Sequence, residues 1–167
     1  MLLCAALTIG PGFAALAGTQ ETVTFTAVVP NVLELTTTSN AAGVTIVSGD
    51  YASSDAITSE SVAAHDLKVR SNRAWVISAK SGAASFGFVP TVTGDTRTKP
   101  ASDLAVRKAG GTYAALSTTN ATLATGSAGG VSGSGNTFAV DYKFASNITL
   151  DPPGTYTLDA IYTLTAP

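Results

Sequence analysis

The sequence predicts an all-β protein, a single antiparallel β-sandwich domain, and three observations support this fold class. Apolar residues alternate with polar ones in many short segments, which is the period of a strand with one buried face. Turn-forming residues separate these segments. After the first 17 residues, no long stretch has apolar residues at helical spacing. Because each half-exposed sheet must cover its apolar face, two sheets packed together are expected.

Length and charge favour one domain that associates with itself. The chain has 167 residues, which suits a single hydrophobic core. Charged residues make up 12% of it, about half of the roughly 25% usual in soluble domains. Strand faces rich in Thr, Ser and small residues repel each other weakly, so copies of the chain are expected as partners. With a net charge of −2 and no basic patch, nucleic acid is not an expected partner.

The first segment has the features of a signal peptide. Residues 1–17 are apolar and uncharged, and they end in Ala15-Leu16-Ala17, the small-x-small pattern that signal peptidase accepts. We predict cleavage after Ala17 and a secreted chain at the extracellular surface; a buried core helix is the alternative interpretation. Cys4 lies in this segment, so no disulfide is expected in the mature domain. The sequence has no other segment suited to spanning a membrane, and the mature chain is expected to have no span.

The predicted domain, residues 18–167, opens with an alternating segment from Thr22 to Val29. Its apolar positions are Val23, Phe25, Ala27 and Val29. Threonine occupies the positions between the first three of them, so this segment is expected to form a strand with one polar face. Leu33 to Leu35 and Val44 to Val47 are predicted to be the next two short strands.

The middle of the chain predicts a hairpin and the centre of the core. Asp66–Arg70 and Ala74–Lys80 alternate on either side of the turn Ser71-Asn72, and the polar stretch Gly49–Ser61 before them is expected to be loop. Trp75 occupies an apolar position of the second strand, where a large aromatic residue is expected to be buried.

The second half of the chain predicts weaker strands, a loop and two strong strands. Weaker strands are expected around Phe86, Phe88, Val92, Leu104 and Val106. The Gly-rich stretch Thr118–Gly135 is expected to be a mobile loop. Two clear alternating strands then follow, at Phe138–Phe144 and Tyr156–Leu164, on either side of a Pro-Pro-Gly turn.

Catalytic and metal-binding constellations are weak in this sequence. His65 is the single histidine, and it precedes Asp66 at the start of a predicted strand, where a surface position is expected. A nucleophile, base and orienting group cannot be assembled around it, so the protein is not expected to be an enzyme. No cofactor is expected; calcium is a minor alternative, through carboxylates that share one loop-rich stretch. These are Asp50, Asp55, Glu60 and Asp66.

Two further groups of side chains have a functional and a structural interpretation. Lys68, Arg70, Arg73 and Lys80 form the one basic cluster, which is expected to be a solvated strand face. Aromatic residues exposed on one face would stack on sugars, although packing in the core explains most of them. The candidates are Tyr51, Trp75, Tyr113, Tyr142, Tyr156 and Tyr162.

Two stretches resemble a known class of surface protein. Residues 153–164, with a Pro-Gly-Thr-Tyr start and alternating Thr and apolar residues, resemble the last strand of immunoglobulin-like pilin and spore-coat-type secreted subunits. Residues 67–78 are similar to a hairpin of secreted bacterial sandwiches. The resemblance implies an immunoglobulin-like β-sandwich. It also implies that the strand Thr22–Val29 fills a groove of the next subunit, with an assembly chaperone as a further partner.

These observations leave two hypotheses about function. The first is a structural subunit of an extracellular filament, pilus or surface coat, assembled by strand exchange or by pairing of edge strands. In it, Val23, Phe25, Ala27 and Val29 would fill successive pockets of a second copy. The alternative is a monomeric cell-surface carbohydrate-binding or adhesive module, which requires exposed aromatic residues in a shallow groove.

Overall fold

The computed structural model describes residues 22–133 and 135–167 and distinguishes two units, Met1–Pro30 and Asn31–Pro167. The described part of the first unit, residues 22–30, belongs to no strand or helix. The side chains of Val23 and Phe25 in it are 89% and 88% exposed. The predicted signal peptide, its cleavage site and Cys4 lie outside the described residues.

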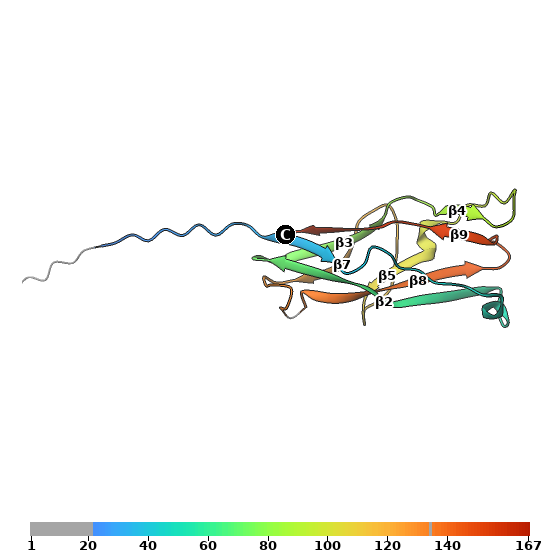
Figure 1. Ribbon diagram of the computed structural model, residues 1–167, viewed down its shortest axis with the longest axis horizontal. Helices are drawn as coiled ribbons and strands as arrows, with labels where there is room; N and C mark the ends of the chain where they lie inside the picture. The colour runs from blue at the N-terminus through green and yellow to red at the C-terminus, as the bar shows by residue number, and fades with distance from the viewer. Residues whose placement is uncertain (1–21, 134) are drawn as a thin grey trace, which may run out of the picture. The chain divides into compact units, whose positions relative to one another are not determined.

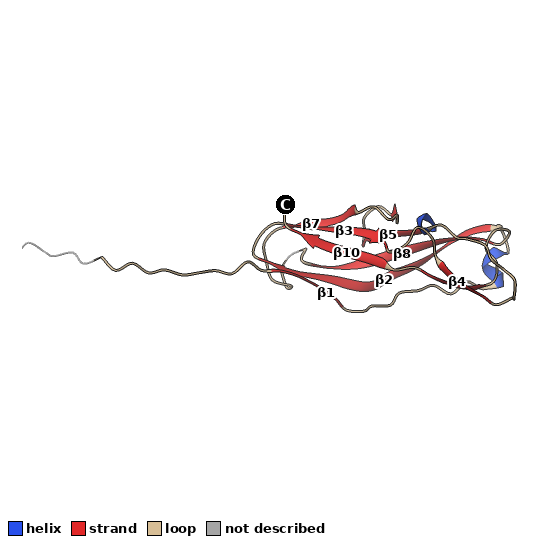
Figure 2. Cartoon of the chain, turned by 90° about the horizontal axis from the view of Figure 1, so that it is seen from above, coloured by secondary structure: helices blue, strands red, loops and turns tan. Residues whose placement is uncertain are grey.

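The second unit is all-β, which confirms the predicted fold class (Figure 1; Figure 2). Its strands are β1 (Leu33–Thr37), β2 (Ala56–Ser71), β3 (Trp75–Ser81), β4 (Gly87–Pro90), β5 (Leu104–Lys108), β6 (Ala114–Ala115), β7 (Ala121–Gly126), β8 (Thr137–Asn147), β9 (Gly154–Thr157) and β10 (Ala160–Thr165). Two short 3-10 helices, η1 (Ser48–Tyr51) and η2 (Ala101–Asp103), complete it. In the described residues, no helix has the length and apolarity that a membrane span requires.

The strands form antiparallel sheets that enclose one hydrophobic core. The larger sheet has the order β1-β2-β8-β5-β6, the second has β10-β3-β7, and β4 pairs with β9 in a ribbon. Trp75 on β3 is 1% exposed and stacks on Phe138 of β8, with 6.4 Å between ring centroids. Its indole N–H donates to the carbonyl of Ser127 at 3.0 Å. The predicted central position of Trp75 is therefore confirmed.

The predicted hairpin of Asp66–Arg70 and Ala74–Lys80 is wrong in its pairing. Both strands exist, but β2 lies in the larger sheet and β3 lies in the second one. Residues 72–74 therefore carry the chain across the core, and Val69 and Trp75 are buried from opposite sides. Apolar faces of two sheets cover each other in this way, whereas a hairpin within one sheet would leave both facing the same direction.

Strand boundaries differ from the predictions in two places before β3. The expected loop Gly49–Ser61 is wrong in its second half, because β2 begins at Ala56 and pairs with the end of β8 from its first residue. The strand expected at Val44–Val47 is also wrong, because residues 38–47 belong to no strand. β-Branched residues favour a strand only where a neighbouring strand offers hydrogen bonds and packing.

Later in the chain, one predicted loop contains a strand, and one predicted strand is two separate strands. The expected mobile loop Thr118–Gly135 contains β7, which pairs with β3. The strand expected at Tyr156–Leu164 is divided into β9 and β10, which belong to different sheets. β8 confirms the strand expected at Phe138–Phe144 and lies between β2 and β5.

Gly126 at the end of β7 allows the close approach of Trp75. A Cβ at this position would lie 2.1 Å from Cζ2 of the indole. We expect Gly126→Ala to lower the free energy of unfolding by about 1–3 kcal/mol, the usual effect of overpacking a core. Urea denaturation measures this change. Gly43→Ala is the matched control, since nothing lies within 4 Å of a Cβ there. Equal effects of both substitutions would contradict the packing argument.

Candidate functional site

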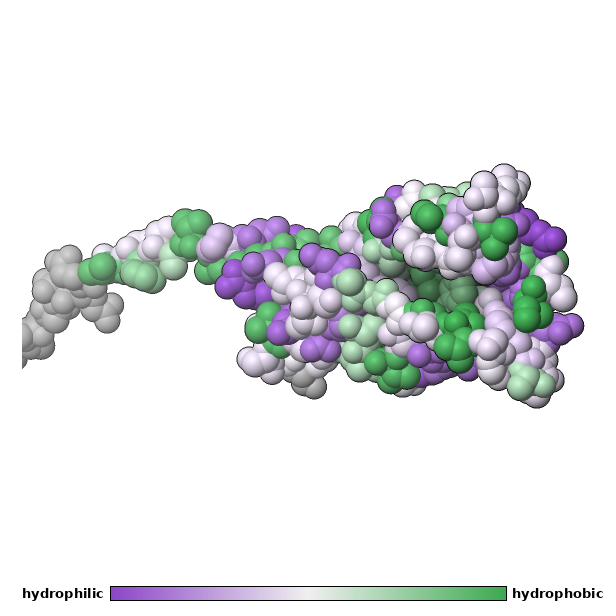
Figure 3. Space-filling view, turned by 45° about the vertical axis from the view of Figure 1, so that its right-hand side comes forward, coloured by the Kyte–Doolittle hydropathy of each residue, from purple (hydrophilic) through white to green (hydrophobic). Residues whose placement is uncertain are grey.

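An open groove of about 1170 Å³ separates the two layers of the second unit along one side. It lies between β2 and β8 of the larger sheet and β9 and β10 on the other side, and residues 38–47 line it as well. Figure 3 shows a hollow in this unit with apolar side chains at its bottom. Aromatic rings make up much of its wall: His65, Phe86, Tyr142, Phe144, Tyr156 and Tyr162.

Strand alternation directs these rings into the groove. Tyr142 and Phe144 are two residues apart on β8 and therefore share a face of the sheet. On β10, Tyr162 is partly buried with Ala160 and Leu164, while the residues between them are exposed. The inner faces of both layers thus line the groove, and the hydroxyls of Tyr142 and Tyr162 join the two layers within it.

Backbone edges without a neighbouring strand border this groove. β1 pairs with β2 only at Leu67–Ser71, and residues 56–66 of β2 have no second neighbouring strand in the described chain. β10 is the terminal strand of its sheet and also has one such edge there. Exposed strand edges present rows of N–H and C=O groups that an added strand can pair with. The groove is therefore an apolar channel with hydrogen-bonding capacity along its rim.

The centre of the groove wall is formed by three rings that contact one another. His65 packs against Tyr142 and Tyr162, with centroids 5.6 and 5.7 Å away. The two tyrosine hydroxyls share a hydrogen bond of 2.5 Å. Burial raises the pKa of both tyrosines, and burial lowers the pKa of His65 more than the neighbouring Asp66 carboxylate raises it. All three side chains are therefore uncharged at neutral pH.

A β-bulge precedes His65, and the burial of its side chain corrects the expectation of a surface histidine. The pairing of β2 with β8 shifts register between Ser61 and His65, and Ala63 within the bulge has a φ of 49°. The Ala63 N–H donates to Oδ1 of the buried Asp141 at 2.8 Å, which holds this conformation. After the bulge, His65 faces inward with Leu67 and Val69 and is only 8% exposed. Alternation back from Leu67 and Val69 gives His65 this face, and the expectation was wrong because β2 begins at Ala56 rather than at Asp66.

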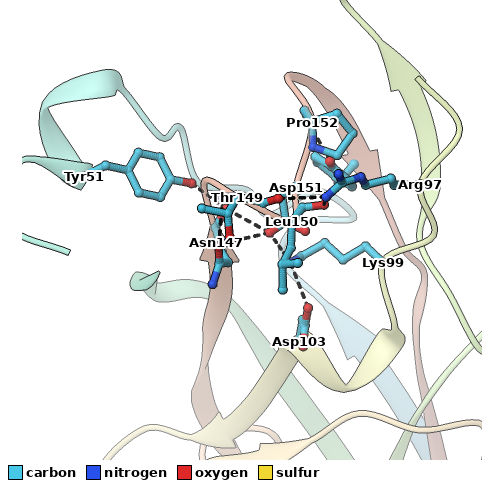
Figure 4. A network of polar contacts seen from close by, with 11 residues as sticks. Tyr51, Arg97, Lys99, Asp103, Asn147, Thr149, Leu150, Asp151 and Pro152 are labelled. Carbon is cyan, nitrogen blue, oxygen red and sulfur yellow. Dashed lines mark hydrogen bonds and ion pairs between the residues drawn. The ribbon is translucent and has the colours of Figure 1, made fainter. Parts of the chain in front are cut away.

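An ionic network closes one end of the groove (Figure 4). The Lys99 side chain is 3% exposed, and its Nζ donates to Asp103 at 2.8 Å and Asp151 at 2.7 Å. Asp151 also accepts from the backbone N–H of Asn147 at 2.9 Å and from the Ser146 hydroxyl, which bonds to Tyr51. Lys99 Nζ lies 4.8 Å from the centroid of the Phe144 ring. The network therefore fixes the connection from β8 to β9 against η2.

The other predicted candidates are not gathered into a site. Within residues 22–133 and 135–167, no group of three His, Cys, Asp or Glu side chains is placed to hold a metal ion. This applies to the carboxylates Asp50, Asp55, Glu60 and Asp66. In the basic cluster, Arg70 forms a surface ion pair with Glu34 at 2.7 Å. Val23, Phe25, Ala27 and Val29 are all exposed and belong to no strand.

Comparisons with known proteins do not identify a relative. The sequence matches no model of a protein family and no curated protein. The functional argument therefore starts from the groove and from the exposed segment Thr22–Val29.

Proposed function

We propose that this protein is a secreted structural subunit of an extracellular filament, pilus or surface coat. Copies of the chain assemble when the segment Thr22–Val29 of one copy adds as a strand to the groove of the next. The observation that carries the proposal is that one chain has both an exposed alternating apolar segment and an apolar groove with strand edges. In this proposal, the domain is an immunoglobulin-like sandwich completed by its neighbour.

The chemistry of the segment and of the groove is complementary. In an extended conformation, Val23, Phe25, Ala27 and Val29 point to one side, as the apolar wall of the groove requires. The threonines at positions 22, 24 and 26 would then face solvent. Backbone N–H and C=O groups of the segment would pair with the edge of β10, so both the apolar and the polar requirements of an added strand are met.

The dimensions are also compatible with strand addition. Eight residues in extended conformation span roughly 26 Å at about 3.3 Å per residue. The edge of β10 has six residues, which corresponds to roughly 20 Å at the same rise. The segment is therefore long enough to follow this edge and to continue beside β9.

Burial of the segment supplies a driving force for assembly. Val23, Phe25 and Val29 are 78% exposed or more in the described chain. Full burial of a Val or Phe side chain is favourable by about 1.5–3 kcal/mol. Burial of three such side chains can offset a large part of the translational and rotational freedom lost on association, and a polar segment would not supply this contribution.

Electron microscopy of the chain from Gly18 onward tests this proposal. We expect filaments or extended oligomers from this chain in negative stain and monodisperse particles from a variant that lacks residues 18–29. Circular dichroism of both proteins serves as the control for folding, because the deletion leaves β1 to β10 intact.

Two results would contradict the proposal. Oligomers of equal size from both proteins would place the contact outside the segment. Monomers from both, together with binding to a glycan array, would instead favour the carbohydrate-binding alternative, which the aromatic wall of the groove can also serve.

A further inference from the structure

We infer that His65 makes strand addition in the groove dependent on pH: the neutral imidazole accepts the apolar segment of a second copy, and the imidazolium rejects it. This inference rests on the proposed function and adds a regulatory property to the same site. It follows from the position of the single histidine of the chain at the wall of the groove.

The surroundings of His65 favour the neutral ring. It is 8% exposed, and two aromatic rings contact it. Among the described residues, neither ring nitrogen of His65 has a hydrogen-bond partner, and the nearby hydroxyls of Tyr142 and Tyr162 bond to each other. A charged imidazolium therefore depends on the solvent in the open groove for its remaining hydration. An inserted strand with Val and Phe side chains would remove that solvent.

The charged groups around His65 do not compensate for this loss. Tyr142 from β8 and Tyr162 from β10 face the ring, and burial raises the pKa of both, so they remain neutral. On β2 itself, the carboxylate of Asp66 raises the pKa of His65, but by less than burial lowers it. Asp141 on β8 is engaged by Arg107 and by the N–H of Ala63.

Two other carboxylates line the groove: Asp159 between β9 and β10, and Asp151 at the closed end. Lys99 is paired there with Asp103 and Asp151, beside Phe144 rather than beside His65. The segment Gly18–Val29 carries one titratable side chain, Glu21, and no histidine. Because burying a carboxylate favours uptake of a proton and burying an imidazolium favours release, a proton lost from the groove on binding is assigned to His65.

The sign of the effect follows from linkage. Burial holds the pKa of His65 below its ordinary value of 6.5 in the open groove, and further burial by the inserted strand lowers the pKa again. At a pH below the pKa that His65 has in the open groove, the imidazolium must release one proton when the strand binds. The dissociation constant then rises by up to tenfold for each unit by which the pH falls, until the pH reaches the pKa of His65 in the filled groove. Well above pH 6.5, where the imidazole is neutral in both states, binding is expected to be independent of this group.

The experiment measures binding of a synthetic peptide with the sequence of residues 18–29. The acceptor is the full chain from Gly18 with Phe25→Asp, which disables its own segment and keeps the groove. Fluorescence anisotropy of the labelled peptide gives the dissociation constant between pH 8 and pH 4.5 (roughly two pH units on either side of the ordinary histidine pKa). We expect a rise of up to tenfold per pH unit on the acid side, and constant affinity when His65→Phe is added.

His65→Gln provides a second acceptor that is neutral at every pH, in case phenylalanine disturbs the bulge. Circular dichroism at each pH restricts the comparison to folded protein. Equal pH dependence with and without His65 would overturn the inference while leaving strand addition intact. Peptide that binds no acceptor at pH 8 would overturn the proposed function and this inference with it.

Discussion

Lys99→Ala is expected to lower the free energy of unfolding by roughly 3–5 kcal/mol, the typical effect of removing one partner from a buried ion pair. Lys99 Nζ is the cation between Asp103 and Asp151, and its side chain is 3% exposed. Without it, two neighbouring carboxylates face each other beside the ring of Phe144. Their repulsion and desolvation would release the connection from β8 to β9.

Urea denaturation followed by circular dichroism measures this loss. Arg70→Ala is the matched control, since it removes one partner of an ion pair of similar length whose side chains are 61% and 49% exposed. Exposed pairs contribute about 0–1 kcal/mol, so the control should change little. If both substitutions had the same small effect, the buried network would not be a determinant of stability.

Phe25→Asp is expected to abolish assembly, while Thr24→Asp leaves it largely intact. The two positions are adjacent, so an extended strand directs one side chain into the groove and the other to solvent. An aspartate at position 25 would need to bury a carboxylate among aromatic rings, which is strongly unfavourable without a partner. The same charge at position 24 remains hydrated.

Analytical ultracentrifugation and negative-stain microscopy of the two variants measure this difference. Both substitutions fall on exposed residues of the described chain and introduce the same charge. They are therefore matched in net charge and in their effect on the isolated domain. Loss of assembly with both variants would indicate general electrostatic repulsion, and assembly with both would exclude strand addition through this face.

The strands of this protein could be predicted more readily than their partners. Alternation located most of β8, and it identified Trp75 as a core residue. The same signal did not distinguish a hairpin from a crossing between layers, because β2 and β3 have the same alternation in either arrangement. Strand pairing depends on contacts between residues that are distant in sequence. A local pattern of apolar and polar residues carries no information about these contacts.

Part of the groove could be predicted, because four of the six aromatic candidates in the sequence line it: Tyr51, Tyr142, Tyr156 and Tyr162. Alternation also predicts the segment Thr22–Val29, but the rings that form the wall come from β2, β8, β9, β10 and the residue before β4, and only the fold brings these together.

His65 was missed because the strand was expected to begin at Asp66; β2 begins at Ala56, and His65 shares a face with Leu67 and Val69. A buried lysine such as Lys99 gives no sequence signal, since its two carboxylates are brought together by the fold.

The antiparallel register of β2 and β8 has a consequence for how the chain folds. The first residue of β2, Ala56, lies opposite the last residue of β8, Asn147, and β3 lies between β7 and β10 rather than beside β2. Few of these pairings can form before distant parts of the chain meet. Such high contact order slows folding, typically to milliseconds or longer. A newly made chain therefore passes through a period in which its strand edges are open to pairing with other chains before its own core has closed.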